Sequence, residues 1–290
     1  MVNYKTGKWA NEIVGLQNDD GSWGEWFHTL SMPTSKRPMT TEQALRRLIR
    51  LGFTKDDEVI KKALSYMRDC LAGINTVHDR LEKQVDFNIF IELMLAVWIR
   101  RFTRDDDLAN AVAKKWRLIA EAAFSSGRYD PESYVNRLYE VLEPKYGTVK
   151  CTKELLRIDY YYPVSVLAGE ISETIERAYF DYVMDSKKGY YYGFVGAVTQ
   201  PPEVFLSKEA SRYLAAIEIY CEYPNKYCKD KLKIAVDWLK MNKNANGKWD
   251  MGAVVKDGAH FPLSDSWSKA ESREDDCTYR IEKIISALER

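Results

Sequence analysis

Long apolar runs are missing from this sequence, and their absence bears on membranes. No uninterrupted apolar stretch approaches the roughly 18 residues that a membrane-spanning helix needs. The opening segment also lacks the apolar core of a secretory signal peptide. We therefore expect no spanning segment and a cytoplasmic location.

Cysteine is scarce and forms no recognisable framework. The five cysteines, at positions 70, 151, 221, 228 and 277, are odd in number and contain no Cys-x-x-Cys pair. A disulfide scaffold and a zinc ribbon are therefore not expected. Signatures of nucleotide and serine-hydrolase chemistry are missing too, since the chain has no P-loop, no Gly-x-Gly-x-x-Gly and no Gly-x-Ser-x-Gly.

An excess of charge of either sign is also absent. Lys and Arg together number 43, as do Asp and Glu, so the formal net charge is zero and we expect no nucleic-acid partner. With 46% hydrophobic and 30% charged residues, the composition indicates a globular protein. No Ser-, Gly- or Pro-rich linker divides the chain, and we expect a single domain over residues 1–290.

A repeat built on glycine and an aromatic residue is the strongest positive signal. Gly21-Ser22-Trp23 and Gly247-Lys248-Trp249 each follow a helix-like stretch. Looser copies begin at Gly127 and Gly189, which are followed by tyrosines, and at Gly73, where the aromatic is missing. The spacing of 52 to 62 residues fits two helices and two loops. In such a unit the glycine ends one helix, the aromatic folds back on that helix end, and a capped helix follows.

Helical periodicity fills the segments between these turns, and strand signals are nearly absent. The expected helices are 4–16, 41–51, 57–67, 86–98, 106–124, 131–142, 153–158, 208–220, 230–242 and 276–288. Because Pro144 and Pro163 interrupt helices, we expect 144–163 to be an irregular insertion. The sequence therefore predicts an all-α protein.

The helix after each turn tends to be more apolar than the helix before it, which indicates inner and outer helices. The first helix reads as an outer one without a partner and the last as an inner one without a partner. If these two complete each other, the chain closes into a ring of about five to six helix pairs.

The repeat resembles a known family. Trp238-Leu239, Lys243 and Gly247-x-Trp249 are similar to the Gln-Trp repeat of squalene and hopene cyclases, with Lys243 where glutamine is usual. Gln17 before Gly21-Ser22-Trp23 keeps the glutamine. The stretch from Thr41 to Met67 resembles the helix pairs of protein prenyltransferase β-subunits. The resemblance implies an α/α toroid, with inner helix starts facing an apolar cavity for isoprenoid chains.

The family's catalytic motifs are altered in this chain. The cyclase Asp-x-Asp-Asp motif has its nearest match in Arg273-Glu274-Asp275-Asp276, where Arg273 replaces the first acid. No Asp-Asp-x-x-Asp magnesium motif is present, because Asp105-Asp106-Asp107 is followed by leucine and alanine. We interpret that triplet as a helix N-cap.

The most chemically suggestive set is Asp275, Asp276 and Cys277, which we take as candidate catalytic residues. The resemblance to protein prenyltransferases implies a zinc ion on Asp275 and Cys277, with His260 as the only histidine nearby to complete the set. Two alternatives stay open. One acid could cap the last helix beside a small buried Cys277, or Cys277 could be a reactive thiol at a helix start.

Candidate ligand-binding residues lie in the loops that lead into the expected inner helices. Histidines in such loops are more often solvated, and aromatics there are more often packing, so each candidate has a structural alternative. The set is Trp26, His28, Thr41, Tyr160, Tyr191 and Trp267.

Three functions remain open from the sequence. The first is a toroid that binds an isoprenoid or another apolar small molecule, acting as a cyclase or transferase or only as a binding protein. The second is a non-catalytic repeat scaffold for protein interaction. The third is a polysaccharide lyase or glycosidase on the same kind of toroid.

Overall fold

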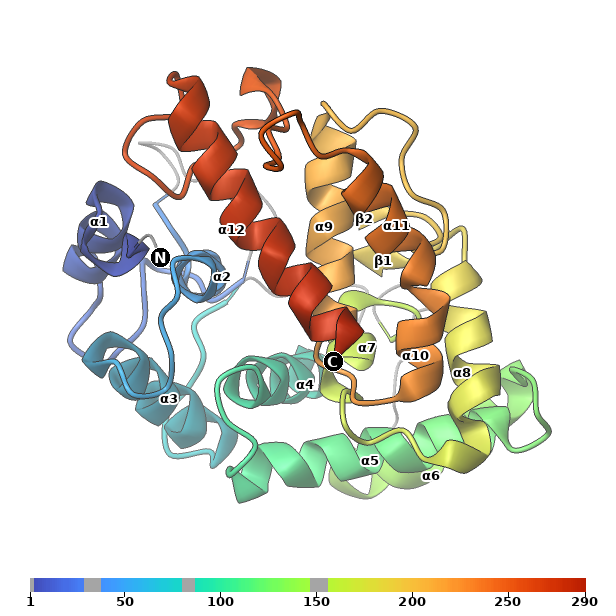
Figure 1. Cartoon of the computed structure of the whole chain (residues 1–290). Coiled ribbons are helices and arrows are strands. Elements are labelled where there is room, and N and C mark those ends of the chain that lie inside the picture. The colour runs from blue at the N-terminus through green and yellow to red at the C-terminus, as the bar shows by residue number, and fades with distance from the viewer. Residues whose placement is uncertain (1–2, 29–37, 80–86, 147–155) are drawn as a thin grey trace. The chain divides into compact units, whose positions relative to one another are not determined.

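The computed structural model describes residues 3–28, 38–79, 87–146 and 156–290, and this part of the chain is predominantly helical (Figure 1). The predicted all-α class is confirmed. The helices are α1 Lys8–Gly15, α2 Thr41–Arg50, α3 Glu58–Leu71, α4 Phe87–Arg100, α5 Asp107–Phe124, α6 Pro131–Tyr146, α7 Tyr161–Val166, α8 Glu173–Asp185, α9 Lys208–Tyr220, α10 Lys226–Lys231, α11 Lys233–Met241 and α12 Ala270–Glu289. Short 3-10 helices cover η1 Tyr4–Thr6 and η2 Ala253–Val255, and β1 Tyr190–Tyr191 pairs antiparallel with β2 Phe194–Val195.

Helix starts with a strong capping residue lie where the sequence predicts them. Thr40 caps α2 in a capping box with Gln43, and the carboxylate of Asp106 accepts the amide of Ala109 at 2.9 Å. Each side chain satisfies an amide that the first turn of a helix leaves unpaired. The interpretation of the acidic triplet as an N-cap is confirmed at Asp106.

Several boundaries differ from the prediction. Helix α6 continues through Pro144 to Tyr146, and α7 begins inside the segment 144–163 expected to be irregular, with Pro163 in its first turn. A proline in the first turn removes no intrahelical hydrogen bond, so the helix tolerates it. The segment 230–242 contains parts of two helices, α10 and α11, which a break at Leu232 separates. Half of the expected 153–158 helix lies outside the described residues, and 156–158 is not helical.

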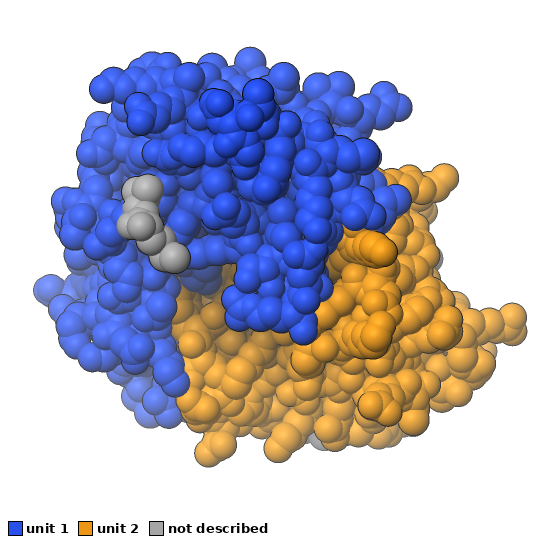
Figure 2. Space-filling model, in the orientation of Figure 1, with its two compact units in different colours: residues 1–80, 201–217, 234–290 blue, residues 81–200, 218–233 orange. Residues whose placement is uncertain are grey.

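The contacts divide the chain into two compact units, which Figure 2 colours separately. Unit 1 comprises residues 1–80, 201–217 and 234–290, and unit 2 comprises 81–200 and 218–233. Each unit is assembled from stretches that are distant in the sequence. The expected single domain and the closed ring both stay predictions.

In unit 1 the two ends of the chain meet. The ring of Tyr4 packs edge-on against Tyr279 of α12, with centroids 5.0 Å apart. The indole of Trp9 in α1 donates to the carbonyl of Ser264 at 2.9 Å, and the amide of Lys8 donates to Asp265 at 2.7 Å. The predicted neighbourhood of the first and last helices is therefore present, with η1 touching α12 and α1 held by the loop before it.

In unit 2, helix α4 packs against α5, α6 and α7. Its residues from Leu93 to Ile99 are all buried, as predicted for a helix that is apolar nearly all round. A second buried group contains tyrosines linked by their hydroxyls, with Tyr220 donating to Tyr191 at 2.8 Å and Tyr191 donating to the carbonyl of Val183 at 2.6 Å. These bonds satisfy phenol groups that burial would otherwise leave unpaired.

A search of the described helices for a membrane span finds none of sufficient length and apolarity.

Candidate functional site

The two Gly-x-Trp turns of unit 1 form the same hydrogen bonds. The amide of Asn18 donates to the carbonyl of Ser22 at 2.9 Å, and the amide of Asn244 donates to that of Lys248 at 2.8 Å. The glycine amide of each turn then donates to the carbonyl of that asparagine at 3.0 Å. Gly21 and Gly247 have φ values of +96° and +74°, which glycine adopts without strain.

Each tryptophan locks its turn onto the preceding helix. The indole of Trp23 donates to the carbonyl of Ile13 at 2.7 Å, and the indole of Trp249 donates to that of Leu239 at 2.6 Å. Both rings are 1% exposed, so the predicted burial of these tryptophans against helix ends is confirmed.

A threonine of the next α-helix binds the backbone of each tryptophan. The amide of Trp23 donates to the hydroxyl of Thr41 at 2.9 Å, and the amide of Trp249 donates to the hydroxyl of Thr278 at 3.2 Å. Thr41 thus has a defined role in the turn. The two copies share four kinds of hydrogen bond, which is a structural repeat and not only a sequence one.

The looser copies preserve less of this arrangement. Gly127 has a φ of +81° and the Tyr129 ring lies 5.5 Å from Phe124, whereas Gly189 lacks a positive φ. Tyr191 is fully buried and its hydroxyl is bonded within the tyrosine group. Tyr160 caps α7 beneath the guanidinium of Arg157, 4.9 Å from its ring. Both tyrosines proposed as ligand-binding residues therefore have packing roles.

A pocket of about 300 Å³ opens beside the first turn, and we call it the repeat-turn pocket. It brings together Trp26 and Thr41, two of the residues predicted to bind a ligand. His28 does not line it, because the Nδ1 atom of His28 pairs with Asp79 at 2.9 Å. The lining comprises Asn18, Asp20, Ser22, Trp23, Gly24, Glu25, Trp26, Phe27, Thr41, Tyr66 and His78.

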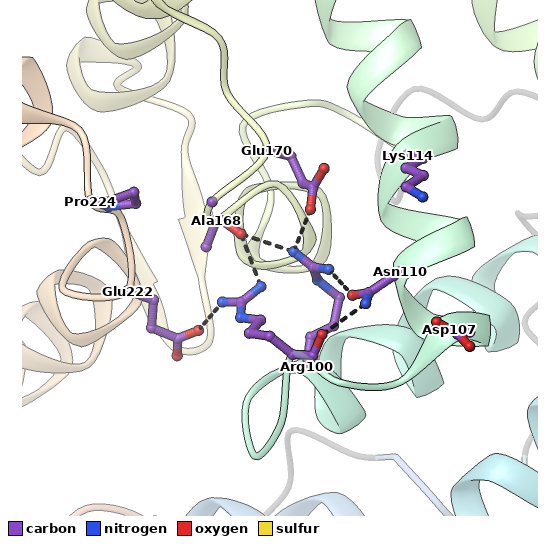
Figure 3. A pocket seen from close by; sticks show the side chains of 10 residues that line it. Arg100, Asp107, Asn110, Lys114, Ala168, Glu170, Glu222 and Pro224 are labelled. Atoms are coloured by element: carbon purple, nitrogen blue, oxygen red, sulfur yellow. Dashed lines mark hydrogen bonds and ion pairs between the residues drawn. The ribbon is translucent and has the colours of Figure 1, made fainter.

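Unit 2 has a larger pocket, of about 730 Å³, that no sequence prediction anticipated (Figure 3). Arg100 donates to the carbonyl of Ala168 at 3.0 Å and to Glu170 at 2.9 Å. Arg104 donates to the same carbonyl at 2.9 Å and pairs with Glu222 at 3.3 Å. Both guanidiniums bind the backbone just after α7 and pair with carboxylates. We therefore assign the two arginines of this pocket a structural role.

A buried polar group in unit 1 involves more of the predicted site residues. We call Arg47, Asp257, His260, Asp276 and Arg280 the His260 cluster. The Oδ1 atom of Asp257 accepts the amides of Ala259 and His260, and its Oδ2 atom lies 2.6 Å from Nδ1 of His260. This local turn fixes the imidazole in the loop before α12.

The protonation states follow from burial and contact. Burial lowers the pKa of His260 to about 4, so the ring is neutral at pH 7. Burial alone would raise the pKa of Asp257, but the hydrogen bonds and charge of His260 bring it well below its usual range. A carboxylate only accepts hydrogen bonds, so the proton lies on Nδ1 and Nε2 is left as an acceptor.

Two arginines contact the residues that follow this imidazole in the chain. Arg47 of α2 donates through Nη2 to the carbonyl of Pro262, and the guanidinium of Arg280 lies over the ring of Phe261 at 5.1 Å. Burial lowers the pKa of Arg47 to about 10. Trp267, another predicted ligand-binding residue, packs 5.1 Å from Phe261, and its indole donates to the carbonyl of Ala253 at 3.0 Å.

The start of α12 corrects the prediction for the acid pair. The helix begins at Ala270 with Lys269 at the N-cap, so Asp275, Asp276 and Cys277 lie in its second and third turns. The expectation that an acid caps this helix is wrong. The carboxylate of Asp276 instead accepts the amides of Leu263 at 2.8 Å and Ser264 at 3.0 Å, which secures the loop that contains His260.

The hypothesis of a reactive thiol at Cys277 is also wrong. The side chain is fully buried, and burial raises its pKa to about 12, so the thiol is protonated at neutral pH. The alternative of a small buried cysteine is the one that the structure supports.

The zinc set is not assembled. Asp275 pairs with Lys248 at 2.8 Å and His260 pairs with Asp257, so the two side chains are committed to different partners. Within the described ranges, no group of three or more His, Cys, Asp or Glu side chains could hold a metal ion.

Sequence reasoning missed Arg47, Asp257 and Arg280. A local signal existed for one of them, because Asp257 three residues before His260 is the spacing of a side-chain-capped turn. The arginines gave no comparable signal, since each lies on a helix whose partners are distant in the sequence.

Comparison with protein-family models, with curated proteins and with solved structures finds no match to this chain.

Proposed function

We propose that this chain is a cytoplasmic, prenyltransferase- or cyclase-like helical repeat protein that binds an isoprenoid or another apolar small molecule. The observation that supports it is the pair of Gly-x-Trp turns, which share four kinds of hydrogen bond. The sequence of these turns resembles the Gln-Trp repeat. The side-chain amide of Gln17, the glutamine of that repeat, donates to the carbonyls of Gly21 and Val59.

Binding without isoprenoid chemistry is the simpler form of this proposal. The acid pair that matches the altered cyclase motif is already engaged, with Asp275 on Lys248 and Asp276 on the loop amides. A carboxylate that accepts hydrogen bonds from both amides and from the Ser264 hydroxyl is poorly placed to give a proton to an alkene.

Native mass spectrometry tests the proposal. We expect protein purified without detergent to retain a small apolar molecule, or to bind added farnesol at one molecule per chain. Acid-unfolded protein serves as the control and should release the molecule. If neither a retained molecule nor farnesol binding is seen, the proposal is wrong and the repeat-scaffold hypothesis gains.

A second candidate function is saccharide binding at the repeat-turn pocket. Its lining joins the aromatic residues Trp23, Trp26, Phe27 and Tyr66 to the polar groups of Asn18, Asp20 and Glu25. Aromatic faces with nearby hydrogen-bonding groups suit sugar rings, which favours the lyase or glycosidase alternative. Calorimetry with a panel of acidic and neutral oligosaccharides tests it, and Trp26→Ala should abolish any binding that involves this pocket.

A further inference from the structure

The His260 cluster contains two buried polar atoms without a partner. Among the described residues, nothing accepts a hydrogen bond from Nη1 of Arg47 and nothing pairs with Nε2 of His260. Both residues are only 4% exposed. Buried donors and acceptors are nearly always paired in folded proteins, so a group bound from outside the chain could supply the partners of these two atoms.

The formal charges of this cluster cancel, because the guanidiniums of Arg47 and Arg280 are matched in number by the carboxylates of Asp257 and Asp276, but the carboxylates bind other partners. Arg47 forms its described hydrogen bond to a neutral carbonyl, that of Pro262, and not to a carboxylate. The Asp257 carboxylate is taken up by His260 and backbone amides, and the Asp276 carboxylate is taken up by Leu263 and Ser264. Arg280 adds a second guanidinium that both Arg47 and His260 sense. Among the described residues, no carboxylate forms a hydrogen bond or ion pair with Arg47.

The two unpaired atoms differ in what they need. Nη1 of Arg47 is a donor and requires an anionic oxygen. Nε2 of His260 is an acceptor, because Nδ1 carries the proton toward Asp257, and it therefore requires an O–H group. A monoprotonated phosphate offers both on one centre, whereas an ionised carboxylate has no proton to donate.

We propose that the His260 cluster binds a phosphate group, with an anionic oxygen on Arg47 and a P–OH directed at Nε2 of His260. Arg280 supplies further positive charge, and Asp257 holds the imidazole in the accepting tautomer. If the phosphate is the polar end of an apolar ligand, the inference rests on the proposed function. Binding of inorganic phosphate alone does not depend on that function, so the phosphate site and the apolar-ligand proposal can fail separately.

Thermal unfolding and calorimetry with sodium phosphate at pH 7 test this inference, with sodium acetate at matched ionic strength as the control anion. Phosphate should raise the unfolding temperature of the wild-type chain saturably, and acetate should not. His260→Asn retains a donor toward Asp257 and removes Nε2, and we expect phosphate affinity to fall by about tenfold or more.

Arg47→Gln should weaken phosphate binding by a similar factor. The matched control is Arg273→Gln, because Arg273 lies on α12 in the same unit and pairs with Asp250 at 3.0 Å, outside the cluster. It should bind phosphate like the wild type. If Arg47→Gln does not fold, His260→Asn decides the question.

Three results would overturn the inference. Phosphate could fail to stabilise the wild-type chain, which would show that solvent satisfies the two atoms. Acetate could stabilise it equally, which would assign the effect to general anion screening. His260→Asn could retain full affinity, which would place the phosphate elsewhere. Tighter binding of a phosphate monoester than of inorganic phosphate would identify an organic phosphate as the natural ligand.

Discussion

The two Gly-x-Trp turns are alike up to the tryptophan and different after it. In the first, Thr41 binds the tryptophan amide and is itself the first residue of α2. In the second, Thr278 makes the same bond, but α12 begins at Ala270, eight residues earlier. The hydrogen bonds of the turn are thus the same in both copies, while the helix that follows begins earlier in the second copy.

The extension in the second copy organises the loop before it. Asp276 lies in the added turns and binds the amides of Leu263 and Ser264, and Arg273 pairs with Asp250. Within the His260 cluster, Asp276 therefore belongs to what the second copy adds, whereas Arg47 lies on α2, which follows the first turn. Substitutions should separate the shared features from the added ones, with effects that range from several kcal/mol for a buried ring to about 1 kcal/mol for a single hydrogen bond.

The strongest test addresses what is shared. Trp23→Ala and Trp249→Ala should each lower the free energy of unfolding by about 3–5 kcal/mol, because a large buried ring is lost and a cavity is left. Urea unfolding followed by circular dichroism measures both. A loss below about 1 kcal/mol in one copy would show that its tryptophan is not structural, and the equivalence of the turns would fail.

Acidification should lower the stability that comes from His260, which lies in the loop that the added turns of α12 secure. The pKa of His260 is about 4 in the folded chain against 6.5 unfolded, so the unfolded chain takes up a proton first as the pH falls. Stability from this residue is complete above pH 6.5 and is lost down to pH 4, by about 3 kcal/mol in total. His260→Asn has no proton to take up. Urea unfolding between pH 7 and pH 4 should therefore show a steeper loss in the wild type, and equal slopes would contradict the assignment.

Asp276→Asn tests how the added turns secure the loop. The amide has one accepting oxygen in place of two and brings its own donors against those of Leu263 and Ser264, so we expect a loss of about 1–3 kcal/mol. Asp275→Asn is the matched control, since its partner Lys248 lies on the surface, and it should change stability little. If both variants behave alike in urea unfolding, the loop does not depend on Asp276.

The smallest effect concerns the threonines. Thr41→Val and Thr278→Val remove the acceptor of each tryptophan amide with little change of shape, and each should cost about 1 kcal/mol. Hydrogen exchange of the Trp23 and Trp249 amides provides a local measurement. Faster exchange in one variant only would mean that the fourth shared bond matters in a single copy.

The features that the sequence predicts well are those with local causes. The helix start at Thr41, the cap at Asp106 and the burial of Trp23 and Trp249 follow from residues within a few positions of one another. The start of α12 was missed because Ala270 to Asp275 can all be helical, while the acid pair imitates a cap. The true partners of Asp276 lie in a loop whose conformation no local pattern specifies.

The candidate site was predicted only in part for a related reason. His260 was a candidate because it is the only histidine near the acid pair in the sequence, and Asp276 and Cys277 were candidates as an acid beside a thiol. Arg47 meets Pro262 across 215 residues of sequence, so its role depends on tertiary structure alone. The zinc interpretation failed because spacing shows which residues are close in sequence, and not which other partners they will bind first.

The way unit 1 is assembled has a consequence for biosynthesis. Trp9 binds Ser264, a residue translated 255 positions later, and Tyr4 packs against Tyr279. Every segment of unit 2 lies between residues 81 and 233. On the ribosome, unit 2 therefore has all its parts first, while the N-terminal stretch keeps apolar surface uncovered until α12 emerges. That interval is when the nascent chain is most dependent on chaperones.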